Sequence, residues 1–276
     1  MSLFEAVSLL APKSSKTSIK SWLKEGRVLI DNEIAKIGTT EVLPGQTISL
    51  APKSHYLEEG VKVLYEDRYI IVVDKPEGLL SVATAFEKGD TLHGLLKKKF
   101  HQPIHVVHRL DQETSGVMVF ALNEKARDGL KKIWEKHEIE RSYTAVVEGI
   151  CKEQTGTWQC YLVEADDYHV YPTKDPSIGR LATTHFRCIK STNKFSLLEL
   201  TLDTGRKNQI RVHCQEAGHP IVGDKKYGSK KNPLKRMALH AHFLGFPHPI
   251  TGKQLRFSSP VPDSFLRLIK LGKEDI

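Results

Sequence analysis

The chain has 276 residues, of which 39% are hydrophobic and 27% are charged, and its formal net charge is +8. This hydrophobic fraction is enough to form a core, which excludes wholesale disorder. No apolar run approaches the roughly 20 residues that a membrane-spanning helix needs, and the first residues lack a secretory apolar stretch. We therefore expect a cytoplasmic protein without membrane contact. The length fits one large domain and a small module.

Metal and redox chemistry find little support in the sequence. The four cysteines are widely spaced and form no C-x-x-C pair, which argues against a disulfide framework and a zinc site. Three histidines, at positions 101, 105 and 108, are close in sequence, but Pro103 would break a helix that aligned them. We expect no metal site. A metalloprotein that uses these histidines remains the alternative that a metal assay would test.

The positive charge is concentrated in one stretch of the chain. Residues 205–240 contain nine basic and two acidic residues, which accounts for nearly the whole net positive charge of the chain. Residues 1–60 contain seven of each kind, although five basic and two acidic residues fall within positions 1–30. Basic clusters attract phosphates because they release condensed counterions. The stretch at 205–240 therefore favours a polyanionic partner over a merely solvated loop.

In chain order, residues 1–52 look like a separate small module, followed by a linker at 53–60. A helix is expected at 18–25, because Ile19, Trp22 and Leu23 share one face, and Gly26 would end it. Strands are expected at 28–30 and 46–50, with a turn at Asp31-Asn32.

Residues 61–276 form the second, larger domain. Its apolar runs predict strands at 69–73, 104–107, 117–122, 143–147 and 198–202. Helices are expected after Thr91, after the N-cap residue Asn123, and from Ile210 to Ala217 before Gly218. Helices and strands alternate without a βαβ rhythm, which predicts an α+β fold with a mixed, largely antiparallel sheet and flanking helices. The N-terminal module is expected to be a small α/β unit.

The densest polar segment, His108 to Gly116, lies between two apolar runs and contains Asp111. If Asp111 is buried it needs a cationic partner, which would keep it ionised and able to act as a nucleophile or a base. The alternative is that Asp111 only bonds a turn through Thr114 and Ser115, which spacing alone favours.

Several segments together resemble the RluA-type pseudouridine synthases. His108-Arg109-Leu110-Asp111-Gln112-Glu113-Thr114-Ser115-Gly116 is similar to the catalytic signature of that family. Further similar segments follow in the family's order across roughly residues 61–265. They are 72–78, Arg141-Ser142-Tyr143, 202–213, 219–224, 227–228, 238–241 and 248–249. Residues 1–50 resemble, more weakly, the small α-L RNA-binding domain that often precedes these enzymes.

The resemblance implies an isomerase that converts uridine to pseudouridine within RNA, without a cofactor. It implies that Asp111 is the catalytic carboxylate, acting as a nucleophile or by abstracting the C2′ proton. Arg211 would be its bidentate ion-pair partner, and Tyr143 would stack on the flipped uracil.

The family also implies residues that bind the substrate. Arg109 would share a strand side with Asp111 and occupy the vacated space or hold a phosphate. We place His108 with it in substrate binding, and Arg206 and Lys207 would guide the RNA backbone.

The implied partner is RNA, with large-subunit ribosomal RNA favoured and transfer RNA as the competitor, and we expect a monomer. Two other classes remain open. One is a non-catalytic RNA-binding protein on the same scaffold. The other is a nucleotide or sugar hydrolase, which would usually need a second acid near Asp111, such as Glu113.

Overall fold

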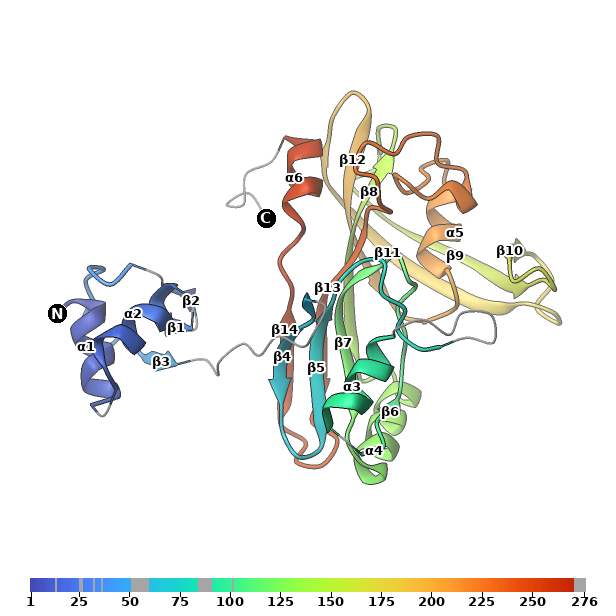
Figure 1. Ribbon diagram of the computed structural model, residues 1–276. Helices are drawn as coiled ribbons and strands as arrows, with labels where there is room; N and C mark the ends of the chain where they lie inside the picture. The colour runs from blue at the N-terminus through green and yellow to red at the C-terminus, as the bar shows by residue number, and fades with distance from the viewer. Residues whose placement is uncertain are drawn as a thin grey trace. The chain divides into compact units, whose positions relative to one another are not determined.

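The computed structural model describes residues 1–12, 14–24, 27–31, 33–35, 37–50, 60–83, 91–100 and 102–270. The chain divides into two compact units, residues 1–55 and 56–276. Figure 1 shows the helices and strands of both units. The expected helix end at Gly26, Asn32 of the expected turn and all of the expected linker except Gly60 lie outside the described residues. No helix of the described part is long and apolar enough to cross a membrane.

The N-terminal unit consists of two helices and a three-stranded sheet. Its elements are α1 (Leu3–Leu10), α2 (Lys16–Lys24), β1 (Val28–Ile30), β2 (Glu33–Ile34) and β3 (Ile48–Leu50), with strand order β2-β1-β3. The predicted apolar helix face is confirmed, since Ile19 and Leu23 are buried against Leu3 and Val7 of α1. Helix α1 was not predicted. Its signal was a capping box, in which the side chains of Ser2 and Glu5 bond each other's backbone N–H.

The larger unit is built on one eleven-stranded sheet. Nine strands run in the order β10-β9-β11-β12-β8-β13-β7-β5-β4, with β14 beside β13 and β6 beside β7. Of the pairings between named strands in this sheet, only β13 with β7 is parallel. The predicted α+β class with a largely antiparallel sheet is therefore confirmed. The strands are β4 (Lys62–Glu66), β5 (Ile70–Lys75), β6 (His105–Val106), β7 (Ser115–Ala121), β8 (Glu140–Glu148), β9 (Thr155–Glu164), β10 (Val170–Thr173), β11 (Arg180–Ser191), β12 (Phe195–Leu202), β13 (Leu239–Pro247) and β14 (Gln254–Ser258).

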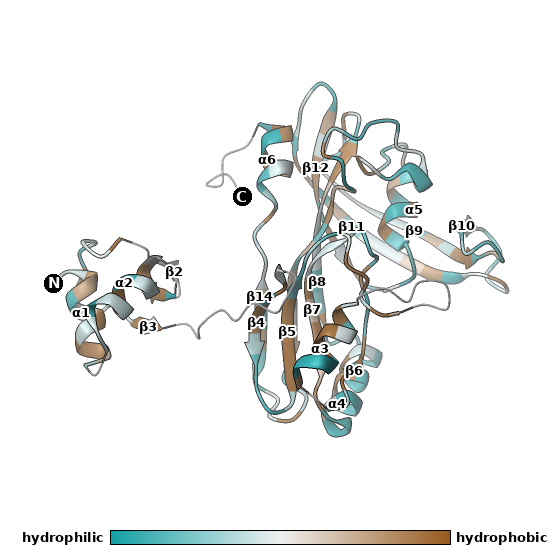
Figure 2. Cartoon of the chain, viewed as in Figure 1, coloured by the Kyte–Doolittle hydropathy of each residue, from teal (hydrophilic) through white to brown (hydrophobic). Residues whose placement is uncertain are grey.

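Four α-helices occur in the described residues of the larger unit. They are α3 (Leu92–Phe100), α4 (Glu124–Glu135), α5 (Gln209–Glu216) and α6 (Asp263–Ile269), with a short 3-10 helix, η2, at Lys225–Tyr227. In β5, Ile71 and Val73 pack with α3, while Ile70 and Val72 pack with α4. A strand that is covered on both faces needs apolar residues at every position, which explains its unbroken apolar run. Figure 2 shows β5 as a brown strand.

The expected element ends are mostly confirmed. Asn123 caps α4 by accepting a hydrogen bond from the backbone N–H of Ala126, at 2.9 Å. Helix α5 is followed by Gly218, whose φ of +78° is the left-handed conformation that glycine adopts readily. The strand predicted at 69–73 ends too early, because Asp74 and Lys75 also pair with β7.

Candidate active site

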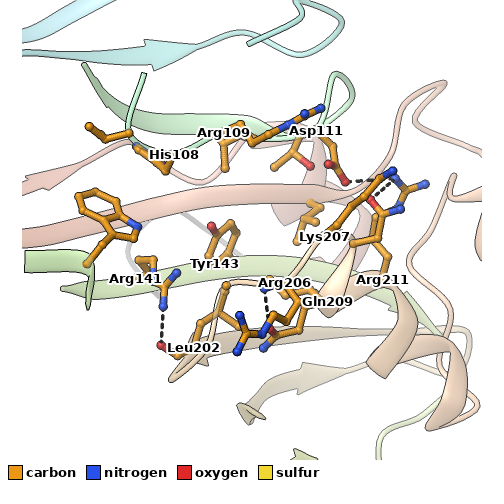
Figure 3. Close-up of a pocket in the computed structure, with 18 of the residues that line it drawn as sticks. His108, Arg109, Asp111, Arg141, Tyr143, Leu202, Arg206, Lys207, Gln209 and Arg211 are labelled. Atoms are coloured by element: carbon orange, nitrogen blue, oxygen red, sulfur yellow. Dashed lines mark hydrogen bonds and ion pairs between the residues drawn. The ribbon is translucent and has the colours of Figure 1, made fainter. Parts of the chain in front are cut away.

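The predicted site residues meet in one pocket of about 440 Å³ (Figure 3). Its walls are the loop between β6 and β7, the first residues of β8, and the segment that leads from β12 into α5. All seven predicted residues line it: His108, Arg109, Asp111, Tyr143, Arg206, Lys207 and Arg211. Asp111 and Arg211 lie 100 positions apart, so the fold, and not local sequence, brings these residues together.

The carboxylate of Asp111 is not engaged by the turn in which the residue lies. Thr114 donates its backbone N–H to the backbone carbonyl of Asp111, at 3.1 Å. The Ser115 hydroxyl instead bonds Nδ1 of His240, at 2.8 Å. The alternative in which Asp111 only bonds a turn through Thr114 and Ser115 is therefore wrong, and its side chain, 27% exposed, is available in the pocket.

A buried lysine holds the loop that carries Asp111. The Lys75 ammonium donates hydrogen bonds to the backbone carbonyls of Pro76, Leu79 and Gln112, at 3.0, 2.8 and 3.1 Å. Gln112 is also bonded to Gly78, whose N–H reaches the Gln112 carbonyl at 2.9 Å. Burial lowers the pKa of Lys75 to about 8, and the negative charge of Asp111 partly offsets this decrease. The turn after β5 and the Asp111 loop thus form one hydrogen-bonded unit.

Arg211 lies between two carboxylates. Its Nη1 donates to Oδ2 of Asp111 at 3.1 Å, while its Nε and Nη2 donate to the two oxygens of Asp224, each at 2.7 Å. Its guanidinium carbon also lies 4.8 Å from the centre of the Tyr227 ring. The expected ion pair with Asp111 is present, but the expected bidentate geometry is wrong, because the paired bonds go to Asp224.

Burial and the two carboxylates act on Arg211 in opposite directions. Burial alone would lower its pKa, but the hydrogen bonds and charge of Asp224, with a smaller part from Asp111, raise the pKa above its usual value. The Asp224 side chain is fully buried and that of Arg211 is 9% exposed. Arg211 is therefore a permanently charged, fixed group beside Asp111.

Strand β8 supplies Tyr143 and Arg141, which lie two residues apart and so share one side of the strand. Tyr143 is half-buried and packs against the cores on both sides of the site. Burial raises the pKa of its hydroxyl; Arg141 opposes this shift and Asp111 adds to it. Tyr143 is therefore a neutral aromatic wall in the same pocket as Asp111.

His108 has a role in the fold as well as a place in the pocket. Strand β6 pairs with β7 through only two residues, and beyond them Nε2 of His108 accepts the backbone N–H of Val119 at 3.0 Å. Its ring lies 5.0 Å from that of Trp134. Burial, with a smaller effect of the Arg141 charge, lowers the pKa of His108 to about 3. His108 is therefore a neutral residue and supplies no charge for phosphate binding.

The remaining three predicted residues are exposed basic side chains. Arg109 and Asp111 both line the pocket, but they lie in a loop, so our reasoning from a shared strand side is wrong. Arg206 donates from Nε to the carbonyl of Leu181 at 3.0 Å. Lys207 forms an ion pair with Glu164. Of the two, Arg206 has no carboxylate partner among the described residues.

Sequence reasoning missed several residues that support this site. Asn208 bonds Arg211 through Oδ1 at 3.3 Å and the Tyr227 hydroxyl through Nδ2 at 2.9 Å. Gln209 is buried and ties the backbone of Arg206 to β11 through Thr183. For Asp224 a signal existed, because it is one of two acids in the basic stretch that contains Arg211.

The described lining of the pocket contains few groups for acid catalysis or metal binding. Asp111 is the one carboxylate among the described residues that line it, and Glu113 is exposed outside that lining. The pair of acids typical of a glycoside hydrolase is therefore not formed in this part of the chain. No cluster of three potential metal ligands occurs in the described residues; His101 is outside them.

Known proteins resemble this chain in sequence and in fold. A family model described as RNA pseudouridylate synthase matches residues 69–216. The ribosomal large subunit pseudouridine synthase D of Haemophilus influenzae is 32% identical and that of Xanthomonas campestris is 34% identical. Each alignment covers 99% of this chain, and 91% and 89% of the respective relative. An uncharacterized RNA pseudouridine synthase of Bacillus subtilis is 32% identical over 93% of this chain and 89% of its own length.

A solved structure agrees with these relatives. The human RNA pseudouridylate synthase domain containing 4 superposes with a TM-score of 0.62 at 25% identity, covering 76% of this chain and 93% of its own. The match to the family model includes Asp111, Tyr143 and Arg211 of the pocket. The chain therefore belongs to the RNA pseudouridine synthases, a family of RNA isomerases, as its sequence motifs predicted.

Proposed function

We propose that this enzyme isomerises a uridine of large-subunit ribosomal RNA and that Asp111 is its catalytic carboxylate. The observation that carries the proposal is the position of Asp111, which is bonded to the buried Arg211 and lines the same pocket as Tyr143. A carboxylate that is hydrogen-bonded to a fixed cation is suited to attack C1′ of the ribose or to take the C2′ proton. Both routes lead to rupture of the bond between C1′ and N1.

The uridine must leave its base stack to reach Asp111, which costs a few kcal/mol. Stacking of the uracil on Tyr143 would return part of that cost, since a base–aromatic contact is worth about 1–3 kcal/mol. Arg109, exposed at the same pocket, would hold a phosphate or fill the space that the base leaves. His108 would contribute a neutral wall, and Arg206 would guide the RNA backbone.

The choice of ribosomal RNA follows from the relatives. The Haemophilus and Xanthomonas proteins are named for the large ribosomal subunit, and this chain aligns with them over nearly its full length. The basic stretch supports an RNA partner, although three of its nine charges are paired within the protein: Lys207, Arg211 and Arg236.

The experiment compares Asp111→Asn with a control at the neighbouring acid, Glu113→Gln. Purified variants are incubated with large-subunit ribosomal RNA from cells that lack the enzyme, and pseudouridines are mapped. We expect Asp111→Asn to bind the RNA but to form no pseudouridine, and Glu113→Gln to match the wild-type enzyme. Retained turnover in Asp111→Asn would contradict the catalytic assignment. Wild-type enzyme is also incubated with transfer RNA from the same cells, and new pseudouridine there alone would contradict the choice of substrate.

We further propose that residues 1–52 form an RNA-binding module and residues 61–276 the catalytic domain. In α2, Lys16 and Lys20 are exposed, while Ile19 and Leu23 are buried in the core of the unit. Replacing both lysines by glutamine in the full chain should weaken RNA binding, and the slope of log K against log salt concentration should fall by about 2. The single-turnover rate should stay unchanged. Unchanged affinity would argue against an RNA-binding role for this unit.

A further inference from the structure

Within the described ranges, Arg141 is a half-buried cation that forms no ion pair with a carboxylate. In the described part of the chain, its Nε is the only buried side-chain nitrogen or oxygen that lacks a hydrogen-bond partner. Its Nη2 makes one long contact, 3.4 Å, to the carbonyl of Leu202. Asp203 is the acid whose charge acts on it most, but that carboxylate bonds Nε2 of His185 at 2.8 Å. No ion pair of Arg141 occurs among the described residues.

The fold nevertheless keeps a place for this guanidinium in the pocket wall. A Cβ atom at Gly205 would lie 2.4 Å from Nη1 of Arg141, so a larger residue there would displace the end of this side chain. Burial lowers the pKa of Arg141, with Tyr143 and Asp203 opposing the shift, so the charge is held there at a cost. Native structures rarely leave a buried polar group unpaired unless the site uses it. The missing partner is therefore an anion that enters the pocket.

The geometry favours the base of the substrate over its phosphates as that anion. Arg141 shares a side of β8 with Tyr143, on which the uracil would stack. Figure 3 shows the two side chains next to each other on this strand, with the Arg141 guanidinium directed toward the carbonyl of Leu202. Arg109 and Arg206 are exposed cations of the same pocket and are better placed for phosphates, which stay outside.

We propose that Arg141 donates hydrogen bonds to the carbonyl oxygens of the uracil and stabilises the negative charge that the base carries after it leaves the ribose. This inference rests on the proposed function, because it requires a uridine on Tyr143. When the bond between C1′ and N1 breaks, its electron pair stays on the base, which becomes a uracil anion. After the base rotates, C5 supplies an electron pair to C1′; on the nucleophilic route the ester bond to Asp111 breaks at the same carbon, and on the other route C2′ regains the proton that Asp111 took. The hydrogen on C5 then leaves as a proton and N1 gains one, so no oxidant or reductant is needed.

The test measures binding and chemistry separately in Arg141→Gln, Arg141→Lys and the control Arg256→Gln. Arg256 is an exposed arginine on β14, 3.2 Å from Glu140 and outside the pocket lining. With enzyme in excess over large-subunit ribosomal RNA, we expect Arg141→Gln to slow the single turnover by about 100- to 1,000-fold, the effect of removing one donor from an anion site. Arg141→Lys should recover part of the rate. The dissociation constant should change little, and Arg256→Gln should behave as wild type.

Two further readouts separate this role from a structural one. In RNA made with 5-fluorouridine, the fluorine stabilises the uracil anion, so the rate penalty of Arg141→Gln for base cleavage should be smaller than with uridine. The melting temperature should stay the same or rise, because the substitution removes a buried charge that has no partner.

Three results would overturn the proposal. One is a wild-type single-turnover rate in Arg141→Gln. Another is a lower affinity with an unchanged rate, which would identify a phosphate contact. The third is an equal rate penalty with uridine and 5-fluorouridine. If wild-type enzyme forms no pseudouridine at all, the proposed function has failed instead.

Discussion

The pairing of Arg211 predicts that Asp224 matters more for stability than Asp111 does. Asp224→Asn removes the charge from a fully buried carboxylate that accepts two 2.7 Å bonds from Arg211. Breaking a buried ion pair on one side costs about 3–5 kcal/mol. For a domain of this size, one kcal/mol shifts the melting temperature by about 2–4 °C, so the expected decrease is about 6–20 °C. Turnover should fall as well, because Arg211 loses its orientation.

The matched control is Asp111→Asn, the same chemical change on the same guanidinium. Asp111 accepts one bond, at 3.1 Å, and its side chain is 27% exposed, so its loss should cost only about 1 kcal/mol. Urea unfolding followed by tryptophan fluorescence, with calorimetry for the melting temperature, measures both variants. Two results would contradict the assignment of the stronger pairing to Asp224. One is an equal decrease in the free energy of unfolding for both substitutions, and the other is a decrease of less than about 1.5 kcal/mol for Asp224→Asn.

Three further predictions concern the pocket. Tyr143→Ala should weaken binding of substrate RNA by about 1–3 kcal/mol in filter-binding measurements, and Tyr143→Phe should restore it. Arg206→Gln should lower the salt slope of RNA binding by about 1, whereas Lys207→Gln should lower it less, since Lys207 is already paired with Glu164. Because the pKa of His108 is lowered from 6.5 to about 3, the unfolded chain binds more protons between these values. Stability should therefore rise with pH across that interval, and urea titrations should show a shallower rise in His108→Gln.

Much of the larger unit could be predicted because its signals are local. The apolar run of β5, the N-cap at Asn123 and the glycine after α5 each reflect the physics of one short segment. The long strands β9 and β11 were not predicted. Their burial alternates or is interrupted by exposed positions, and no short apolar run marks them. Their pairing joins residues that lie 18 to 32 positions apart, which a single segment does not reveal.

The site shows the same limit more sharply. The motifs identified Asp111, Tyr143 and Arg211, and the structure brings all three to one pocket. The sequence did not indicate that Arg211 divides its bonds between two acids, because Asp224 becomes its partner only when η2 folds beside α5. Nor could the sequence show that the His108 ring accepts a backbone N–H of β7. That bond depends on where β6 stops pairing with β7, which is set by the folded sheet.

The shared position of Arg211 has a consequence for the energy of the reaction. A cation with a single carboxylate partner would be left uncompensated whenever that carboxylate formed an ester or took up a proton. Arg211 keeps its two short bonds to Asp224 whatever the charge state of Asp111. In the reaction that we propose for Asp111, its surroundings would therefore need little reorganisation as the charge of this carboxylate disappears and returns.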